Sequence, residues 1–175
     1  MGRKGTRQAM ELETWTAPPG DRIPNHPRFP VLLYRGVDAA AAGADAARAC
    51  FAANDWGGSW VDGVFDFHHF HSTSHEVLAV VAGRATLELG GPQGQAFDVA
   101  AGDVVVLPAG TGHRRARADG GFTVVGAYPA GQEDYDLLRG DDPVEVEVEA
   151  ARERIAALGA PPSDPVGGDG VAGWR

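Results

Sequence analysis

The stretch Gly63–Gly83, GVFDFHHFHSTSHEVLAVVAG, and the later stretch Gly102–Arg117, GDVVVLPAGTGHRRAR, decide the fold of this chain. Each begins with glycine and contains a run of Val, Leu or Phe. Similar β-rich runs surround them, separated by glycine pairs such as Gly90-Gly91 and Gly120-Gly121. Short apolar runs divided in this way by turn signals predict an all-β sandwich or small barrel.

Composition supports one folded domain with many turns. The chain has 175 residues, and 25 of them are glycine, which is about twice the usual frequency. Hydrophobic residues make up 43% of the chain and four residues are tryptophan, a composition that argues against disorder. We therefore expect a single domain in which the glycines mark turns.

Charge and composition also exclude several classes of protein. The net charge of −9 counts against a nucleic-acid binder, which usually presents a basic surface. No apolar run approaches the roughly 20 residues of a membrane span, and no apolar segment follows the basic N-terminal residues as a signal peptide requires. Cys50 is the only cysteine, which suits a reducing compartment. We expect a cytoplasmic protein with no nucleic-acid or membrane partner.

The two ends of the chain are predicted to differ from its β-rich middle. Proline and glycine are frequent near the N-terminus, so residues 1–27 are expected to form a flexible arm. The alanine-rich segment 39–53 predicts one helix, with Asp38 or Asp45 as its N-cap.

After Pro129 the β pattern weakens, and residues 131–175 are expected to form a C-terminal helix and a Pro/Gly-rich tail. Val146–Leu158 has the pattern of that helix, and Gly159 is suited to its C-terminus. Val171 and Trp174 are the residues that could attach the tail to the barrel.

Five of the six histidines lie between positions 68 and 113. His69 and His71 are two residues apart, so on a strand they would project from the same face. Glu76 follows after a polar turn, and His113 follows the turn 108–112. Three imidazoles and one carboxylate suit a divalent first-row metal such as Fe, Mn, Ni or Zn. The alternative is a chance cluster, because an isolated His-x-His pair usually binds nothing.

The spacing of these residues resembles the two sequence motifs of the cupin superfamily. The first motif is Gly, five residues, His-x-His, three or four residues, Glu, six residues and Gly. The second is Gly, five residues, Pro-x-Gly, two residues, His, three residues and Asn. Nine of these ten positions match in the chain: Gly63, His69, His71, Glu76, Gly83, Gly102, Pro108, Gly110 and His113. Arg117 stands in place of Asn, at a position that holds no metal ligand in the family.

The chain is most similar to small single-domain bacterial cupins of mostly unassigned activity, which carry a segment like Asn54–Gly58 before the first motif. The resemblance implies a cupin-type double-stranded β-helix, or jelly-roll barrel, over about residues 28–130, with one N-terminal and one C-terminal helix. It assigns the metal to His69, His71, Glu76 and His113. It also implies a homodimer, in which the segment 17–30 would pair across the interface.

Such a centre suggests several kinds of chemistry. Four protein ligands leave one or two open positions on a five- or six-coordinate ion, as in catalytic sites. One carboxylate leaves the divalent ion with a net charge of +1, which favours a small anionic ligand. We expect a metal-dependent enzyme of small-molecule metabolism, either dioxygenase-like with Fe(II), or isomerase- or decarboxylase-like with Mn, Ni or Zn. The alternative is a non-catalytic cupin that binds a metabolite for sensing or storage.

Three further residues are candidates for contact with a substrate. Tyr128 is a candidate proton donor. Arg114 and Arg115 are candidates for binding a substrate carboxylate, although a solvated edge strand would also account for them.

The aromatic residues and remaining histidines near the motifs are expected to have structural roles. Phe65 and Phe67 are predicted to belong to the barrel core. Trp60 could line the mouth of a pocket or anchor the core. His68 and His75 lack the spacing of the ligand set, so we place them at the surface or beside the ligands.

Overall fold

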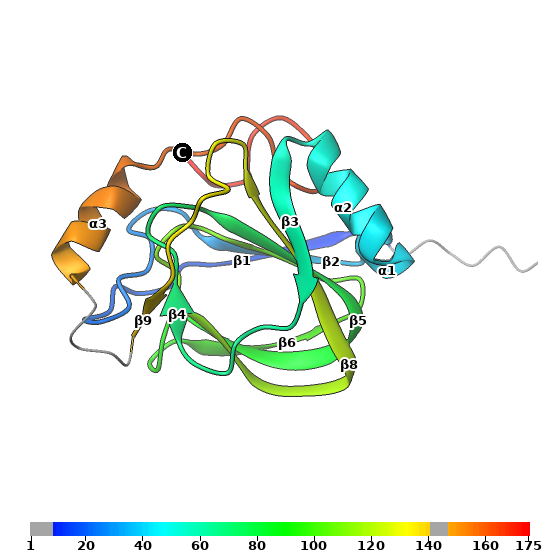
Figure 1. Cartoon of the computed structure of the whole chain (residues 1–175), viewed down its shortest axis with the longest axis horizontal. Helices are drawn as coiled ribbons and strands as arrows, with labels where there is room; N and C mark the ends of the chain where they lie inside the picture. Colours follow the sequence, from blue (N-terminus) through cyan, green and yellow to red (C-terminus); the bar gives the residue numbers. More distant parts are fainter. Residues whose placement is uncertain (1–8, 141–146) are drawn as a thin grey trace, which may run out of the picture.

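The computed structural model describes residues 9–140 and 147–175. Within these ranges a nine-stranded antiparallel sheet curls around an apolar core, and three helices pack outside it (Figure 1). The prediction of an all-β barrel is confirmed. The strands are β1 Glu11–Trp15, β2 Val31–Arg35, β3 Trp56–Asp62, β4 His69–Phe70, β5 Glu76–Leu89, β6 Gln95–Ala100, β7 Val104–Leu107, β8 His113–Pro129 and β9 Leu138–Arg139. The helices are α1 Asp38–Ala42, α2 Ala44–Ala53 and α3 Val148–Ala157.

The long strands β5 and β8 form the centre of the sheet. The strand order is β1-β2-β7-β5-β8-β4-β9, while β3 also pairs with β8 and β6 with β5. On one edge of β5, the first four residues pair with β7 and the last six with β6. Its other edge pairs with β8, from Val77 opposite Ala127 to Leu89 opposite His113. Both edges of β5 are therefore hydrogen-bonded, and the sheet curls along its length.

Gly83 lies where β5 bends. The register between β5 and β8 shifts on either side of Ala82, and Gly83 has a φ of +68°, in the left-handed region that favours glycine. A Cβ atom at Gly83 would lie 2.5 Å from the carbonyl oxygen of Asp119. The last glycine of the first motif is therefore required by a close approach between two strands.

Alternating side chains divide the core between the two faces of the sheet. In β2, Leu32 and Tyr34 pack in a cluster that includes Phe51 of α2. Val31 and Leu33, which alternate with them along the strand, belong to a second cluster inside the curl of the sheet. Strands buried on both faces show continuous apolar runs rather than an apolar-polar alternation, which is what β2 and β7 contain.

The segment 39–53 forms two helices rather than the single helix expected. Gly43 ends α1 and precedes α2 with a φ of +118°, which breaks the helical backbone. The predicted N-caps are also wrong: Val37 and Gly43 occupy the N-cap positions without a side-chain cap, and Asp38 and Asp45 lie in the first turns. Aspartate there still interacts favourably with the helix dipole.

Helix α3 forms within the predicted range, although residues 141–146 lie outside the described part of the chain. It ends just before Gly159, with Leu158 as its C-cap. No helix among the described residues is long and apolar enough to cross a membrane.

Much of the expected N-terminal arm is folded against the sheet. Residues 11–15 form β1, which pairs with β2 from Glu11 opposite Arg35 to Trp15 opposite Val31. Further along, Asn25 is buried and its side-chain amide donates to the carbonyl of Gly90 and accepts from the amide of Gly112. Side-chain hydrogen bonds of this kind let a segment without regular secondary structure pack inside. Residues 1–8 lie outside the described part of the chain.

The C-terminal tail is attached to the barrel through Val171 and Trp174, as predicted. Val171 and Trp174 are buried. The Trp174 ring stacks on Phe29 at 5.1 Å, and its indole nitrogen donates to the carbonyl of Pro30 at 2.8 Å. The tail therefore holds the start of β2 from outside the sheet.

We expect His26 to make the protein sensitive to acid. Burial lowers the pKa of His26 to about 4, helped by the nearby His75 and Arg28, while its unfolded pKa is about 6.5. Its Nδ1 accepts hydrogen bonds from the amides of Arg28 and Phe29. As the pH falls from about 6.5 to 4, His26 binds a proton in the unfolded chain but stays neutral in the folded chain. The free energy of unfolding therefore decreases.

Urea unfolding at pH 7 and pH 5 measures this effect. In His26→Asn, which keeps a side-chain acceptor but does not titrate, the loss of stability between the two pH values should be smaller by roughly 1–2 kcal/mol. The same loss in both proteins would contradict this role of His26.

Candidate metal centre

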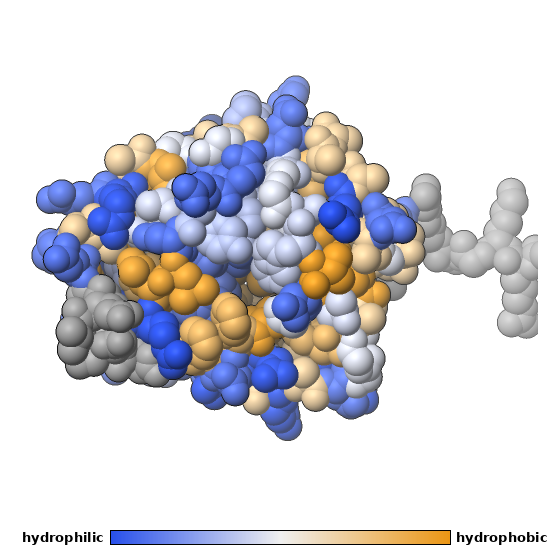
Figure 2. Space-filling view, viewed as in Figure 1, coloured by the Kyte–Doolittle hydropathy of each residue, from blue (hydrophilic) through white to orange (hydrophobic). Residues whose placement is uncertain are grey.

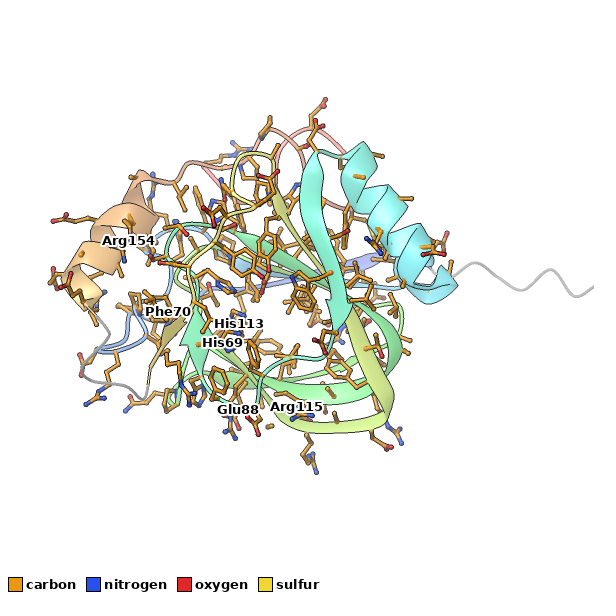
Figure 3. All side chains as sticks on the ribbon, in the orientation of Figure 1. His69, Phe70, Glu88, His113, Arg115 and Arg154 are labelled. Atoms are coloured by element: carbon orange, nitrogen blue, oxygen red, sulfur yellow. The ribbon has the colours of Figure 1, made fainter. Side chains whose placement is uncertain are left out.

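The four side chains predicted as metal ligands meet at one end of the curled sheet. His69 begins β4, and His71 directly follows that strand. Glu76 is the first residue of β5 and His113 the first residue of β8. His69 pairs with His113 across the β4–β8 ladder, and Figure 3 shows the two side by side within the fold. All four residues are buried.

The three histidines form a compact group that could hold a metal ion. One ligand nitrogen from each of His69, His71 and His113 lies within 4.8 Å of those of the other two. The Glu76 carboxylate adjoins this group, with Oε1 3.1 Å from Nε2 of His113 and Oε2 3.3 Å from Nε2 of His71. Glu76 as the fourth ligand stays a prediction.

Main-chain carbonyl groups orient all three imidazole rings. Nδ1 of His69 donates to the carbonyl of Phe67 at 2.9 Å, and Nδ1 of His113 donates to the carbonyl of Thr111 at 2.9 Å. Nδ1 of His71 donates to the carbonyl of Asp136 at 2.5 Å. A carbonyl oxygen can only accept, so each Nδ1 carries the proton and each Nε2 of a neutral ring presents a lone pair.

Burial and mutual charge set the protonation of this cluster. Burial, together with His113, lowers the pKa of His69 to about 3, which makes its ring neutral. Burial also lowers the pKa of His71, but the charge and hydrogen bond of Glu76 raise it above its ordinary value. Burial raises the pKa of Glu76, yet His71 and His113 together hold it well below its ordinary value, so this carboxyl is ionised.

The donor set fits a divalent metal. With each Nδ1 already used as a donor, His71 and His113 could donate to Glu76 only as imidazolium ions, which would bury two positive charges. A divalent cation would satisfy the three Nε2 lone pairs and the carboxylate with neutral rings. Imidazole nitrogens and one carboxylate suit Fe, Mn, Ni or Zn, and hydrogen bonds to the second ring nitrogen are usual for metal-binding histidines.

Tyr128 lies against the carboxylate of Glu76. Its hydroxyl donates to Oε2 of Glu76 at 2.8 Å and accepts from the indole nitrogen of Trp60 at 2.7 Å. Burial and the negative charge of Glu76 raise the pKa of Tyr128, so the hydroxyl keeps its proton. Trp60 therefore joins the site, in agreement with the hypothesis that it lines the pocket.

A cavity of about 540 Å³ opens from the four residues to the surface, a size typical of small-molecule sites. Tyr128, Leu78 and Trp60 line its inner part together with the predicted ligands. Four large hydrophobic residues that line it are exposed: Val61, Phe65, Tyr135 and Leu137.

Comparison with known proteins agrees with this geometry. The chain is 38% identical over 158 residues to the uncharacterized protein YjlB of Bacillus subtilis (strain 168), and the match covers 90% of the chain and 92% of the relative. A family model described as Cupin domain matches residues 61–124, the segment that contains all four predicted ligands. The chain belongs to the cupin family. The name of the relative states no activity, so it assigns none to this cupin.

Among solved structures, the chain matches Streptomyces albus HEPD with substrate 2-hydroxyethylphosphonate and Fe(II) bound, at 13% identity and a TM-score of 0.28. The match covers 84% of this cupin but only 27% of the larger protein. We infer neither a metal nor a reaction from so distant a match.

The structure separates the two adjacent candidate arginines of this cupin. Arg115 lines the cavity, and its amide donates to the carbonyl of Phe65 at 2.9 Å. Arg114 instead donates to the carboxylate of Glu88 at 3.0 Å and does not line the cavity. Arg115 lies two residues after His113 on β8, so the two project from the same face.

The expectation for Phe65 is wrong, and one of the two alternatives for His75 is excluded. Phe65 is not a core residue, because it is 52% exposed and lines the cavity in the loop that precedes β4. Phe65 and Phe67 continue the two-residue spacing of His69 and His71, which is typical of a strand, but the backbone at Phe65 and Phe67 is not a strand. His75 is not at the surface: its Nδ1 accepts from the amide of Ala109, and its Nε2 donates to the carbonyl of Gly159.

Asp136, which no sequence motif indicates, holds the segment around His71. Besides its carbonyl contact with His71, its carboxylate accepts from the amide of Ser72 at 2.6 Å and from the Thr73 amide at 3.3 Å. Arg154 of α3 donates to the hydroxyl of Ser72 at 2.8 Å. Asp136 lies 64 residues from Ser72 in the chain, and no spacing in the sequence indicates this contact.

We expect the purified protein to bind about one equivalent of divalent metal per chain, because one set of buried ligands faces one cavity. His71→Ala should lower the metal affinity at least tenfold, as measured by competition with a chelator. His68→Ala is the matched control, since His68 lies outside the three-histidine group. Elemental analysis that finds no metal after loading with Fe, Mn, Ni and Zn would contradict the assignment.

Asp136→Ala should also weaken metal binding, by about tenfold, although no ligand is removed. The variant keeps the main-chain carbonyl but loses the contacts that hold the turn after His71. Asp134→Ala, an exposed change in the same loop, is the control and should bind metal as the wild type does. Equal metal affinity in both variants, with equal thermal stability of the metal-free proteins, would show that Asp136 does not position His71.

Proposed function

We propose that this cupin is a metal-dependent enzyme that acts on a small anionic molecule. The observation that carries the proposal is the orientation of three buried imidazoles, each held by a hydrogen bond from Nδ1, which leaves Nε2 as the atom that could bind a metal beside Glu76 and one cavity. His69, His71 and His113 would hold the ion, with Glu76 as the fourth ligand. A structural metal site is usually closed by its ligands, whereas this one adjoins a cavity of about 540 Å³.

The charge of the centre supports an anionic substrate. A divalent ion with three neutral histidines and one carboxylate carries a net charge of +1, which attracts oxygen anions. When bound, such an ion supplies Lewis acidity, and iron can in addition support reactions with O2. These two chemistries correspond to the isomerase- or decarboxylase-like and the dioxygenase-like alternatives.

Arg115 supports the same class of substrate. Within residues 9–140 and 147–175 it has no ion pair or side-chain hydrogen bond, in contrast to Arg114 with its partner Glu88. It lines the same cavity as the candidate ligands. A guanidinium on the wall of a pocket can bind a carboxylate through two parallel hydrogen bonds.

Tyr128 would hold a proton next to the centre. Its hydroxyl hydrogen is directed to Oε2 of Glu76, and Trp60 donates to its oxygen. This chain of two hydrogen bonds fixes the carboxylate and keeps the negative charge of Glu76 partly neutralised inside the protein.

One observation favours a second candidate, a cupin that binds a metabolite without converting it. Apart from the predicted ligands, the titratable residues in the described lining of the cavity are Asp62, Asp66, Arg115, Tyr128 and Tyr135. Tyr128 already donates to Glu76, while Asp62 and Asp66 are exposed at the mouth. Among the described lining residues, no buried carboxyl or imidazole other than the predicted ligands is available as a catalytic acid or base.

Turnover separates the two candidates. The metal-loaded protein, prepared in turn with Fe(II), Mn, Ni and Zn, is incubated with a panel of small carboxylic, 2-oxo and 2-hydroxy acids. Oxygen consumption and product analysis then detect conversion. The enzyme is expected to form a product with one metal and to lose this activity in His71→Ala. Saturable binding of an acid by the loaded protein, with no product under any metal, would favour the binding protein.

The two arginines provide a matched test of anion binding. Arg115→Gln should weaken the binding of pyruvate to the metal-loaded protein by about tenfold, because a charged hydrogen bond is lost. Arg114→Gln, which removes the same charge outside the cavity, should leave this affinity within about twofold. Isothermal titration calorimetry measures both. Equal losses in the two variants would mean that general charge, rather than Arg115, attracts the anion.

A further inference from the structure

Exposed apolar side chains are concentrated at the mouth of the metal cavity. In the described part of the chain, six large hydrophobic residues are exposed: Met10, Leu12, Val61, Phe65, Tyr135 and Leu137. The last four line the cavity, and we refer to them as the collar. Figure 2 shows apolar surface around a hollow on the face in view. Exposed apolar residues grouped in this way mark binding sites, whereas scattered ones need no explanation.

The collar reaches the predicted metal ligands from two sides. Phe65, in the loop after β3, contacts the ring of His69 edge to face, with centroids 5.4 Å apart. Tyr135, in the loop before β9, contacts the ring of His71 edge to face at 4.9 Å. A molecule bound to a metal between these histidines would therefore lie beside apolar and aromatic side chains as it extends toward the surface.

The volume of the cavity indicates how much apolar substance it accommodates. A cavity of about 540 Å³ is in the size range of sites that bind drug-sized molecules, so an acid of two or three carbons leaves space beside it. Leu78 and Trp60 also line the cavity and add apolar and aromatic surface to it. Burial of a ring or an alkyl chain against these side chains is favourable in proportion to the apolar area removed from water.

We propose that the substrate is amphipathic: an acid whose oxygen atoms bind at the metal centre and whose aryl or comparable alkyl group packs inside the collar. This inference rests on the proposed function and adds the substrate class. The collar is the specificity-determining part of the site, because it binds the apolar part of the substrate, which neither the metal nor Arg115 contacts. The collar adjoins the ligand rings and continues into the cavity, which favours a small molecule over a second copy of the chain as its occupant.

Pyruvate and phenylpyruvate test this proposal, because they share the 2-oxo acid group and differ by one phenyl ring. Isothermal titration calorimetry at full metal loading should show that phenylpyruvate binds at least tenfold more tightly than pyruvate. Phe65→Ser and Leu137→Ser should each reduce this preference at least threefold. Leu12→Ser is the matched control, since Leu12 is 43% exposed on β1 and does not line the cavity. It should keep the preference of the wild type.

The possible failures are distinguishable. Equal affinity of the wild type for the two acids, or an unchanged preference in both collar variants, would overturn the role of the collar and leave the proposed function in place. A metal-loaded protein that binds neither acid would overturn both. Light scattering is measured on the same samples: a wild-type dimer that becomes monomeric in Phe65→Ser but not in Leu12→Ser would show that the collar is an interface between copies, which also overturns the proposal.

Discussion

The pairing of β5 with β8 is the constraint on which the rest of the structure depends. It begins at Val77 opposite Ala127 and ends at Leu89 opposite His113. Glu76 is thereby brought to Tyr128 at one end of the ladder, and His113 begins β8 where β4 also pairs. Because side chains alternate along each strand, the same register directs Leu78 into the cavity together with Glu76. Glu76 and His113 lie at opposite ends of this ladder, so the curl of the sheet brings their side chains to 3.1 Å from each other.

Main-chain groups then determine what the histidines can do. Each imidazole gives its Nδ1 proton to a carbonyl, and those carbonyls belong to a loop before β4, a turn before β8 and the loop before β9. The rings are oriented by backbone that the fold holds in place, and the buried charge of Glu76 is balanced by the groups around it. Side chains held in this way lose less conformational entropy when they bind a ligand.

The loop that contains Tyr135 and Asp136 contacts His71, the turn after it and the cavity. Its carbonyl contact orients His71, its carboxylate holds the following turn, and Arg154 links that turn to α3. The same loop contributes Tyr135 and Leu137 to the cavity. The same short segment of chain therefore contacts the candidate metal centre and contributes to the collar.

The sequence predicted the all-β barrel from its short apolar runs and its resemblance to cupins, and the attachment of the tail by Trp174 from apolar character. The resemblance also pointed to His69, His71, Glu76 and His113, which the structure brings together, while their binding of a metal stays a prediction. The sequence also contained a usable signal for Arg115 over Arg114, since Arg115 and His113 are two residues apart on one strand. It misplaced Phe65, whose strand-like alternation falls in a loop, and it treated β1 as part of a flexible arm. Only the tertiary structure decided the pairing of β1, the roles of Asp136 and His75, and the collar around the cavity. These depend on main-chain partners and on contacts between distant segments. Every residue has a backbone carbonyl, and every residue except proline has a backbone N–H, so the sequence does not show which of these groups will meet.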